Sequence, residues 1–213
     1  MTSLPRSYRG YRFPPEIISH AVWLYHRFCL SCHWCLTFGL DYARTLRRRR
    51  GRLGDTWYMD ELFVNIQGRQ QYLWRAVDED GDAIDILVQA KRDRHAAARF
   101  FRKLSKGQGS VPRRLIADKL RSYAAAHLAV MPSVVHATDQ YANNRAEVSH
   151  QPTRQRERQM RRFKSAAHAQ RFTSVHGVVQ NLFRVGRHLL RSAHHRLLRK
   201  RAFHVWDAVT CAG

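Results

Sequence analysis

Three carboxylates, Asp60, Asp118 and Glu147, stand where strands or helices are expected to begin or end in a very basic chain. Between residues 94 and 206 there are only four acidic residues against 24 lysines and arginines. A surface that holds a polyanion should shed carboxylates, so those that it keeps need another role. Clustered carboxylates require neutralising cations, and oxygen ligands suit Mg²⁺ or Mn²⁺. Two cations about 3.5–4 Å apart can clamp both oxygens of an in-line displacement at phosphorus. The pattern therefore predicts phosphodiester chemistry on DNA.

Each carboxylate also has a structural explanation. Asp60 could occupy an edge position of a strand whose buried face is assigned wrongly. Asp118 could cap the helix that follows it, since Asp is a favoured N-cap. Glu147 falls three residues after Asn144, a spacing that fits a capping box. The three together favour a metal site more strongly than any one of them does.

The elements that must position these residues follow from the periodicity of the apolar residues. A period of two predicts strands over 56–66, 71–77, 83–88, 113–117 and 134–137. In the first strand Tyr58, Leu62, Val64 and Ile66 share one face with Asp60. Helical spacing predicts helices over 16–28, 34–46 (interrupted by a glycine), 95–104, 120–130, from 144 onward with a kink at a proline, 172–198 and 202–209.

This order predicts an α/β fold: a mixed five-stranded sheet, antiparallel in one half and parallel in the other, flanked by helices. The first and fourth strands would be adjacent and parallel, which brings Asp60 and Asp118 to one edge of the sheet. The helix after the fifth strand would then lay its first turn, with Glu147, across the same edge.

Bulk composition points to the same partner. The formal net charge is +22 and the sequence pI about 11.1, which predicts binding to a phosphate-rich polymer. No stretch approaches the roughly 18 apolar residues of a membrane-spanning helix, and the first residues lack the apolar core of a secretory signal. We expect a cytoplasmic protein bound to nucleic acid, with no membrane partner.

Two further patterns suggest metals less strongly. Cys29, Cys32 and Cys35, with two histidines nearby, could supply a tetrahedral zinc site, but no second distant pair accompanies them, so an accidental grouping is favoured. The acidic run 78–82 lacks the later bidentate Glu of a calcium loop and predicts a hairpin turn at Asp80-Gly81.

Five motifs follow in order: Gly54-Asp-Thr-Trp-Tyr-Met-Asp60-Glu, Tyr72-Leu-Trp-Arg-Ala-Val-Asp, Ala117-Asp118-Lys-Leu-Arg-Ser-Tyr123, Asn143-Asn-Arg-Ala-Glu147 and His150-Gln-Pro-Thr-Arg-Gln-Arg-Glu-Arg. Together they closely resemble the bacterial insertion-sequence-six family of transposases, within the RNase H-like, Asp-Asp-Glu superfamily. The resemblance covers residues 54–185 well and the N-terminal region loosely. It implies an RNase H-like core with Asp60, Asp118 and Glu147 binding two Mg²⁺ or Mn²⁺ ions. It also implies strand cleavage and transfer at element ends, replicative cointegrate formation, and an oligomer that synapses two ends with target DNA in the bacterial nucleoid.

The chain departs from the family pattern in two places. A helix pair of the N-terminal helix-turn-helix is missing before Trp34-Cys35-Leu36, so the part that would recognise element ends is incomplete. The 28 residues between Asp118 and Glu147 are fewer than in relatives with a longer insertion. Because the Asn-Asn-x-x-Glu context is intact, Glu147 is preferred to Glu157. An alternative is a degenerate copy that binds DNA without catalysis.

These patterns divide the chain into three parts. Residues 1–50 form a basic helical region that ends in an arginine linker, residues 51–165 the RNase H-like core, and residues 166–213 a helical extension. Cations that flank the carboxylates, the linker and the last motif are the predicted DNA contacts: Arg47, Arg48, Arg49, Arg50, Lys119, Arg121, Arg154, Arg156, Arg158, Arg161, Arg162 and Lys164.

Overall fold

The structure is a computed structural model of the chain. It describes residues 8, 10, 11, 13–27, 33–51, 53–108, 111–117, 121–138, 144–159, 162–184 and 191–210. The side chains at positions 27, 33, 34, 36, 121, 122, 144–150 and 159 lie outside this description. The chain forms two compact units, one of residues 1–51 with 174–213 and one of residues 52–173. The division into three functional parts, made above from the sequence, is a different division and stays a prediction.

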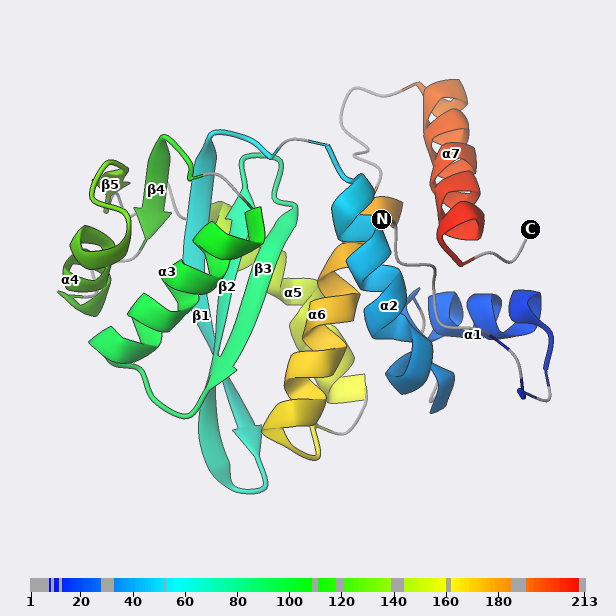
Figure 1. Ribbon diagram of the computed structural model, residues 1–213, viewed down its shortest axis with the longest axis horizontal. Coiled ribbons are helices and arrows are strands. Elements are labelled where there is room, and N and C mark those ends of the chain that lie inside the picture. Colours follow the sequence, from blue (N-terminus) through cyan, green and yellow to red (C-terminus); the bar gives the residue numbers. More distant parts are fainter. Residues whose placement is uncertain are drawn as a thin grey trace. The chain divides into compact units, whose positions relative to one another are not determined.

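The unit of residues 52–173 is built on a five-stranded sheet (Figure 1). Its strands are β1 (Thr56–Ile66), β2 (Arg69–Asp78), β3 (Ala83–Gln89), β4 (Arg114–Ala117) and β5 (Val135–Ala137), in the order β3-β2-β1-β4-β5. β1 pairs antiparallel with β2, and β2 with β3, whereas β1, β4 and β5 are parallel. The mixed sheet predicted from the sequence is confirmed, including the adjacency of the first and fourth strands.

One face of the sheet is covered by α3 (Arg94–Gln108) and α4 (Arg121–Val130) (Figure 1). α3 buries an apolar stripe that includes Phe100, Phe101 and Leu104. These side chains pack in one core with Trp57 of β1 and Trp74 of β2. The spacing of the stripe is what selects a helix over residues 94–108 and fixes the side that it turns to the sheet.

The other face of the sheet carries α5 (Asn144–Gln159), which packs against β1 and β2. The apolar face predicted for β1 is confirmed, since Leu62, Val64 and Ile66 are buried. At the alternate positions Trp57, Met59 and Glu61 are buried, whereas Phe63 is 44% exposed. β1 is therefore enclosed on both faces around Asp60 and open to solvent on one face toward its end.

The outer edge of β3 is closed by a side chain from α6 (Ala166–Phe183). The amide of Gln170 accepts from the backbone N–H of Val88 (2.8 Å) and donates to the carbonyl of Ile86 (3.0 Å). These two bonds occupy backbone groups that a further strand would otherwise pair with, which protects the edge from intermolecular pairing.

The turn between β2 and β3 forms as the Asp-Gly pair predicts. The carboxylate of Asp78 accepts hydrogen bonds from the backbone N–H groups of Asp80 (3.1 Å) and Asp82 (2.8 Å). Gly81 adopts a positive φ of 78°, which a residue without Cβ reaches at little cost. The acidic run is therefore a hairpin turn held by its own first carboxylate.

The other unit is helical and contains α1 (Pro15–Arg27), α2 (His33–Arg49), the end of α6 and α7 (Ser192–Thr210). Its core is aromatic: Tyr42 of α2 meets Trp206 of α7 edge to face, with ring centroids 5.6 Å apart. Ser19 of α1 donates to the hydroxyl of Thr210 (2.8 Å). Among the described residues, no helix is both long and apolar enough to cross a membrane.

Three sequence expectations about helices are wrong. α2 runs unbroken through Gly39, because the glycine lets the helix approach the side chain of Val175, whose Cγ1 would lie 3.3 Å from an added Cβ. Arg47, Arg48 and Arg49 form the last turn of α2 rather than a linker. In the C-terminal region α6 ends at Phe183 and α7 begins at Ser192, so the single helix expected over 172–198 is two helices.

Candidate active site

Asp60 lies on β1 at the point where its pairing with β4 ends. The last pair of that parallel ladder is Met59 with Ala117, so Asp60 is the next position along β1. Its carboxylate is half-buried and accepts the backbone N–H of Glu61 at 2.8 Å. The carboxyl ends of parallel strands are where open α/β sheets bind ligands. Asp118 follows Ala117 in the chain but lies outside the described residues, so its predicted meeting with Asp60 stays a prediction.

Arg75 sits directly opposite Asp60 on the neighbouring strand. The two residues are register partners of β1 and β2, so their side chains leave the same face of the sheet. Arg75 is only 6% exposed, and its Nη1 donates to the hydroxyl of Thr153 on α5 at 3.1 Å. A buried guanidinium thus joins the strand beside Asp60 to the helix that carries Glu147 in its first turn.

Glu61 is a second carboxylate beside Asp60, on the opposite face of β1. It is 8% exposed and forms an ion pair with Arg92. The hydroxyl of Tyr123, from α4, donates to its other carboxylate oxygen. Burial, followed by the negative charge of Glu61, raises the pKa of Tyr123 well above its ordinary value, so the phenol stays a neutral donor. Sequence analysis missed this contact, although an acid at an inward-facing strand position was the available signal.

The network around Glu61 fixes the start of α4 to the centre of the sheet. Tyr123 is fully buried and its ring lies 5.4 Å from that of Trp74, edge to face. Arg92 extends over the ring of Phe63 at 5.6 Å from its centroid. Tyr123 is the last residue of the motif that contains Asp118, so one end of that motif is anchored to β1 by a buried charged hydrogen bond.

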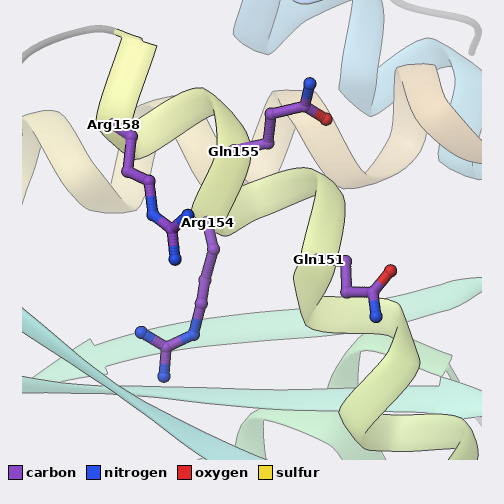
Figure 2. A pocket seen from close by; sticks show the side chains of 4 residues that line it. All are labelled: Gln151, Arg154, Gln155 and Arg158. Carbon is purple, nitrogen blue, oxygen red and sulfur yellow. The ribbon is translucent and has the colours of Figure 1, made fainter.

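The exposed side of α5 borders an open pocket of about 450 Å³ (Figure 2). It is lined by Gln151, Arg154, Gln155 and Arg158. The guanidinium groups of Arg154 and Arg158, one turn apart, extend toward the same side (Figure 2). With 3.6 residues per turn, position 147 falls on the same stripe of the helix as positions 151, 154 and 158. The pocket therefore continues the helix face of Glu147, whose own side chain lies outside the description.

Arg156 is a correction to the predicted DNA contacts. It is 5% exposed and its guanidinium carbon lies 5.8 Å from the centroid of the Phe172 ring. A guanidinium buried over an aromatic ring stabilises the packing of α5 on α6 and is not available to a phosphate. A run of alternating arginines does not reveal which one meets an apolar neighbour.

The other predicted cations fall into three groups. Arg48, Arg49, Arg162 and Lys164 are exposed, and Arg50 is half-buried. Arg47 donates to the backbone carbonyl of Ser174 at 2.9 Å, which commits part of its guanidinium to the helical unit. Lys119, Arg161 and the side chain of Arg121 lie outside the described residues.

Glu157, the rival to Glu147, is half-buried near the end of α5. Burial raises its pKa, against the opposing effect of Arg154, Arg162 and Arg158. The choice between Glu147 and Glu157 stays a prediction, because the Glu147 side chain lies outside the described residues.

Neither alternative metal pattern gains support from the side chains that can be described. Cys35 is buried, with its sulfur 4.0 Å from the carbonyl of Ala21, whereas Cys29 and Cys32 lie outside the described residues. Within the described part of the chain, no group of three or more His, Cys, Asp or Glu side chains could hold a metal ion. Asp118 and the side chain of Glu147 lie outside the described part of the chain.

The strand order, with an acid on the central strand and helices on both faces, defines an RNase H-like core. Residues 54–186 match the family described as a DDE domain, of the IS240 type of transposase. This is more than half of the chain, and the chain belongs to this family of DDE transposases, which are polynucleotidyl transferases.

A curated relative is the transposase for insertion sequence element IS257 in transposon Tn4003 of Staphylococcus aureus. It is 26% identical over 168 residues, which cover 67% of this chain and 75% of that protein. The transposase for the insertion sequence-like element IS431mec of the same species has the same identity and coverage.

Solved structures overlap with the core more loosely. The HTLV-2 integrase catalytic core domain in complex with magnesium is 13% identical, with a TM-score of 0.44, over 64% of this chain and 90% of that one. A chain of the simian T-cell lymphotropic virus intasome in complex with PP2A regulatory subunit B56 gamma has 12% identity and a TM-score of 0.46. That overlap covers 68% of this chain and 53%, about half, of the intasome chain.

Proposed function

We propose that this transposase cleaves and transfers DNA strands at the ends of an insertion sequence, with Asp60, Asp118 and Glu147 as metal-binding carboxylates. The observation that carries the proposal is the parallel pairing of β1 with β4. Its last pair, Met59 with Ala117, immediately precedes two of the three carboxylates in the chain. Two acids that follow paired positions of adjacent parallel strands begin from neighbouring points at one edge of the sheet.

The residues present fit a divalent cation. Asp60 offers a half-buried carboxylate whose orientation is held by the N–H of Glu61. All three proposed ligands are hard oxygen donors, the type that Mg²⁺ and Mn²⁺ prefer. When bound, a pair of such ions would polarise the scissile phosphate and activate the attacking water or 3′-hydroxyl. The buried Arg75–Thr153 hydrogen bond would hold α5, and with it position 147, against the strand of Asp60.

DNA would approach the carboxylates along the exposed stripe of α5. Arg154 and Arg158 share the stripe of position 147, and Gln151 and Gln155 line the same pocket. At about 1.5 Å of rise per residue, the stripe extends roughly 16 Å from position 147 to Arg158. Cations in such a row bind phosphates and so supply affinity without reading sequence. Exposed cations beyond α5 extend the proposed contacts: Arg48, Arg49, Arg162 and Lys164.

The partners in this proposal are the duplex ends of the element and the target DNA. Joining two ends requires at least two active sites, so we propose a homo-oligomer in the synaptic complex, and replicative cointegrates as the product. A DNA substrate in a bacterial cell implies association with the nucleoid. We also propose that the chain has three functional parts: a DNA-binding region of residues 1–50, a catalytic core of residues 51–165 and a helical extension of residues 166–213.

The decisive experiment is a strand-transfer assay with the purified chain, Mg²⁺ or Mn²⁺, and DNA carrying the inverted repeats that flank its reading frame. Asp60→Asn, Asp118→Asn and Glu147→Gln should each abolish the joined product while duplex binding survives. Glu157→Gln, on the same helix, is the matched control and should retain product. Chelation of the metal should stop the reaction of the unmodified chain.

Two results would contradict the proposal in different ways. Activity that survives in one of the three variants would remove that residue from the metal site. A wild-type chain that binds duplex DNA yet yields no product with either ion would refute the catalytic role. The chain would then be a degenerate copy that acts only as a basic DNA-binding protein.

A further inference from the structure

The first half of α7 is largely exposed to solvent. Residues 192–194 and 196–201 are all exposed, whereas the second half buries Ala202, Trp206 and Val209. Even the apolar side chains of the first half face solvent: Leu197 is 46% exposed and Leu198 37%. α7 is thus anchored at one end and bare at the other for about 15 Å, given a rise near 1.5 Å per residue.

A bare helical segment of this length needs an external stabiliser. Isolated helices shorter than about 12–15 residues are marginal in water, because most helix stability in proteins comes from a packed apolar face. The anchored half supplies a nucleus, through contacts such as the Tyr42–Trp206 ring pair. The exposed half gains nothing from it beyond continuity of the backbone. The segment is therefore placed to be completed by a partner.

The charge of the segment indicates what kind of partner fits. Four cations, Arg196, Arg199, Lys200 and Arg201, fall within six residues. With 3.6 residues per turn they spread over more than half of the helix circumference. From Arg158 to Trp206 the chain has no acidic residue, so no neighbouring carboxylate along this stretch neutralises them. Cations on several sides of one helix fit a concave polyanion better than a flat surface.

We propose that the first half of α7 is a docking surface for duplex DNA, lying in the major groove with its cations on the two flanking phosphate rows. The inference deepens the proposed function and rests on DNA being the substrate. The major groove, about 12 Å wide, admits one α-helix. Leu197 and Leu198 match the apolar thymine methyl groups exposed there. A second copy of this chain fits less well, because two such helices would bring like charges together.

This surface would supply a helical DNA contact in a chain whose N-terminal helix-turn-helix is expected, from the sequence, to be incomplete. The exposed stripe of α5 belongs to the catalytic core and follows the phosphates at the reacting ends. The first half of α7 is a separate element in the other unit. It would add affinity for duplex DNA in a way that does not depend on the metal site.

The test compares two variants of equal net charge by fluorescence anisotropy with a labelled duplex, in EDTA so that no reaction occurs. One variant replaces Arg196, Arg199, Lys200 and Arg201 with Gln, which preserves helix propensity. The control replaces four exposed cations of α3 with Gln: Arg94, Arg99, Arg102 and Lys106. Circular dichroism of both variants checks that helix content is retained. Affinity is measured between about 50 and 200 mM salt.

Each phosphate contact contributes about 0.9 to the slope of log affinity against log salt concentration. The α7 variant should lower that slope by roughly 2–4 and the affinity at least about tenfold, and the α3 variant should lower the slope by less than about 1. Equal losses in the two variants would overturn the proposal, since only net charge would matter. Unchanged duplex affinity of the α7 variant would overturn it as well.

Two further measurements test whether a second copy of the chain binds this surface instead of DNA, and whether DNA binding depends on the catalytic site. Replacing Leu197 and Leu198 with Gln should leave the mass in light scattering unchanged. A loss of dimer with duplex affinity intact would instead make this face a contact between copies. The anisotropy comparison is repeated with Asp60→Asn, which should bind as the wild type does. If the wild-type chain gave no strand transfer yet its duplex binding depended on α7, only the catalytic proposal would be refuted.

Discussion

Replacing Tyr123 with Phe removes one hydroxyl from the buried network around Glu61. That hydroxyl donates to a carboxylate that is 8% exposed, and Tyr123 itself is fully buried. Phe keeps the ring contacts with Trp74, at 5.4 Å, and Phe101, at 6.3 Å, so little packing is lost. The variant therefore isolates the hydrogen bond to a buried charge.

The expected loss of stability follows from the type of bond. Hydrogen bonds to charged groups contribute about 1.5–3 kcal/mol, and a buried acceptor that loses its donor retains its desolvation cost. The ion pair with Arg92 still serves the other carboxylate oxygen, so we expect a loss near the middle of the range, about 2 kcal/mol. For a chain of this size, roughly 2–4 °C of Tm per kcal/mol gives a decrease of about 4–8 °C.

Scanning calorimetry of the full chain measures this decrease. Tyr72→Phe is the matched control, because it removes the same atom from a half-buried tyrosine of the same sheet. Its effect should stay within about 0.5 kcal/mol. The double variant with Glu61→Gln should lose less than the two single losses combined, since the residues share one interaction. A Tm change below about 1 °C for Tyr123→Phe, or one equal to the control, would refute the reasoning.

Two further predictions concern Arg75 in the sheet and the histidine pair His127 and His136. Arg75→Lys keeps a cation but not the planar fork that reaches α5, so strand transfer should fall by about 10–100-fold with secondary structure retained, as for other supporting residues of metal sites. An unchanged rate in the strand-transfer assay would contradict this. Burial lowers the pKa of His127, and burial together with the nearby His127 ring lowers that of His136. Protonation therefore favours the unfolded chain, and stability should decline as pH falls below about 6.5 until the lowered pKa values are passed. His136→Gln should flatten this decline when Tm is compared at pH values above and below that point.

Local patterns were sufficient for the elements of the core. The alternation over 56–66 predicts β1 with the bounds that the structure has, and the Asp-Gly turn predicts the β2–β3 hairpin. Both depend on residues near each other in the chain, whose preferences tertiary contacts reinforce here. The parallel adjacency of β1 and β4 was also predictable, because the order of strands and helices leaves few topologies. The ordered motifs then sufficed for the family.

Local patterns failed where a distant residue decides. Gly39 predicted a break in α2, yet the helix continues because Val175 packs where a side chain would be. The break between α6 and α7 was also misplaced, since α6 ends at Phe183 and α7 begins at Ser192. Arg156 was expected among the DNA contacts, but its guanidinium is buried over the ring of Phe172. For Gly39 and Arg156, a contact with a residue distant in the chain outweighs the average preference of the local sequence.

The sequence by itself determined the family, the strand order and Asp60 as a candidate ligand. Motif order and hydrophobic periodicity depend only on the linear order of the residues, so they can be recognised without the fold. Only the tertiary structure decided what surrounds that carboxylate. Arg75 faces it across a ladder, and Tyr123 reaches Glu61 from 62 residues away. Such pairs form because folding removes these groups from water and leaves each with only a few polar partners within reach. Their strength comes from burial, which exists only once the chain has folded.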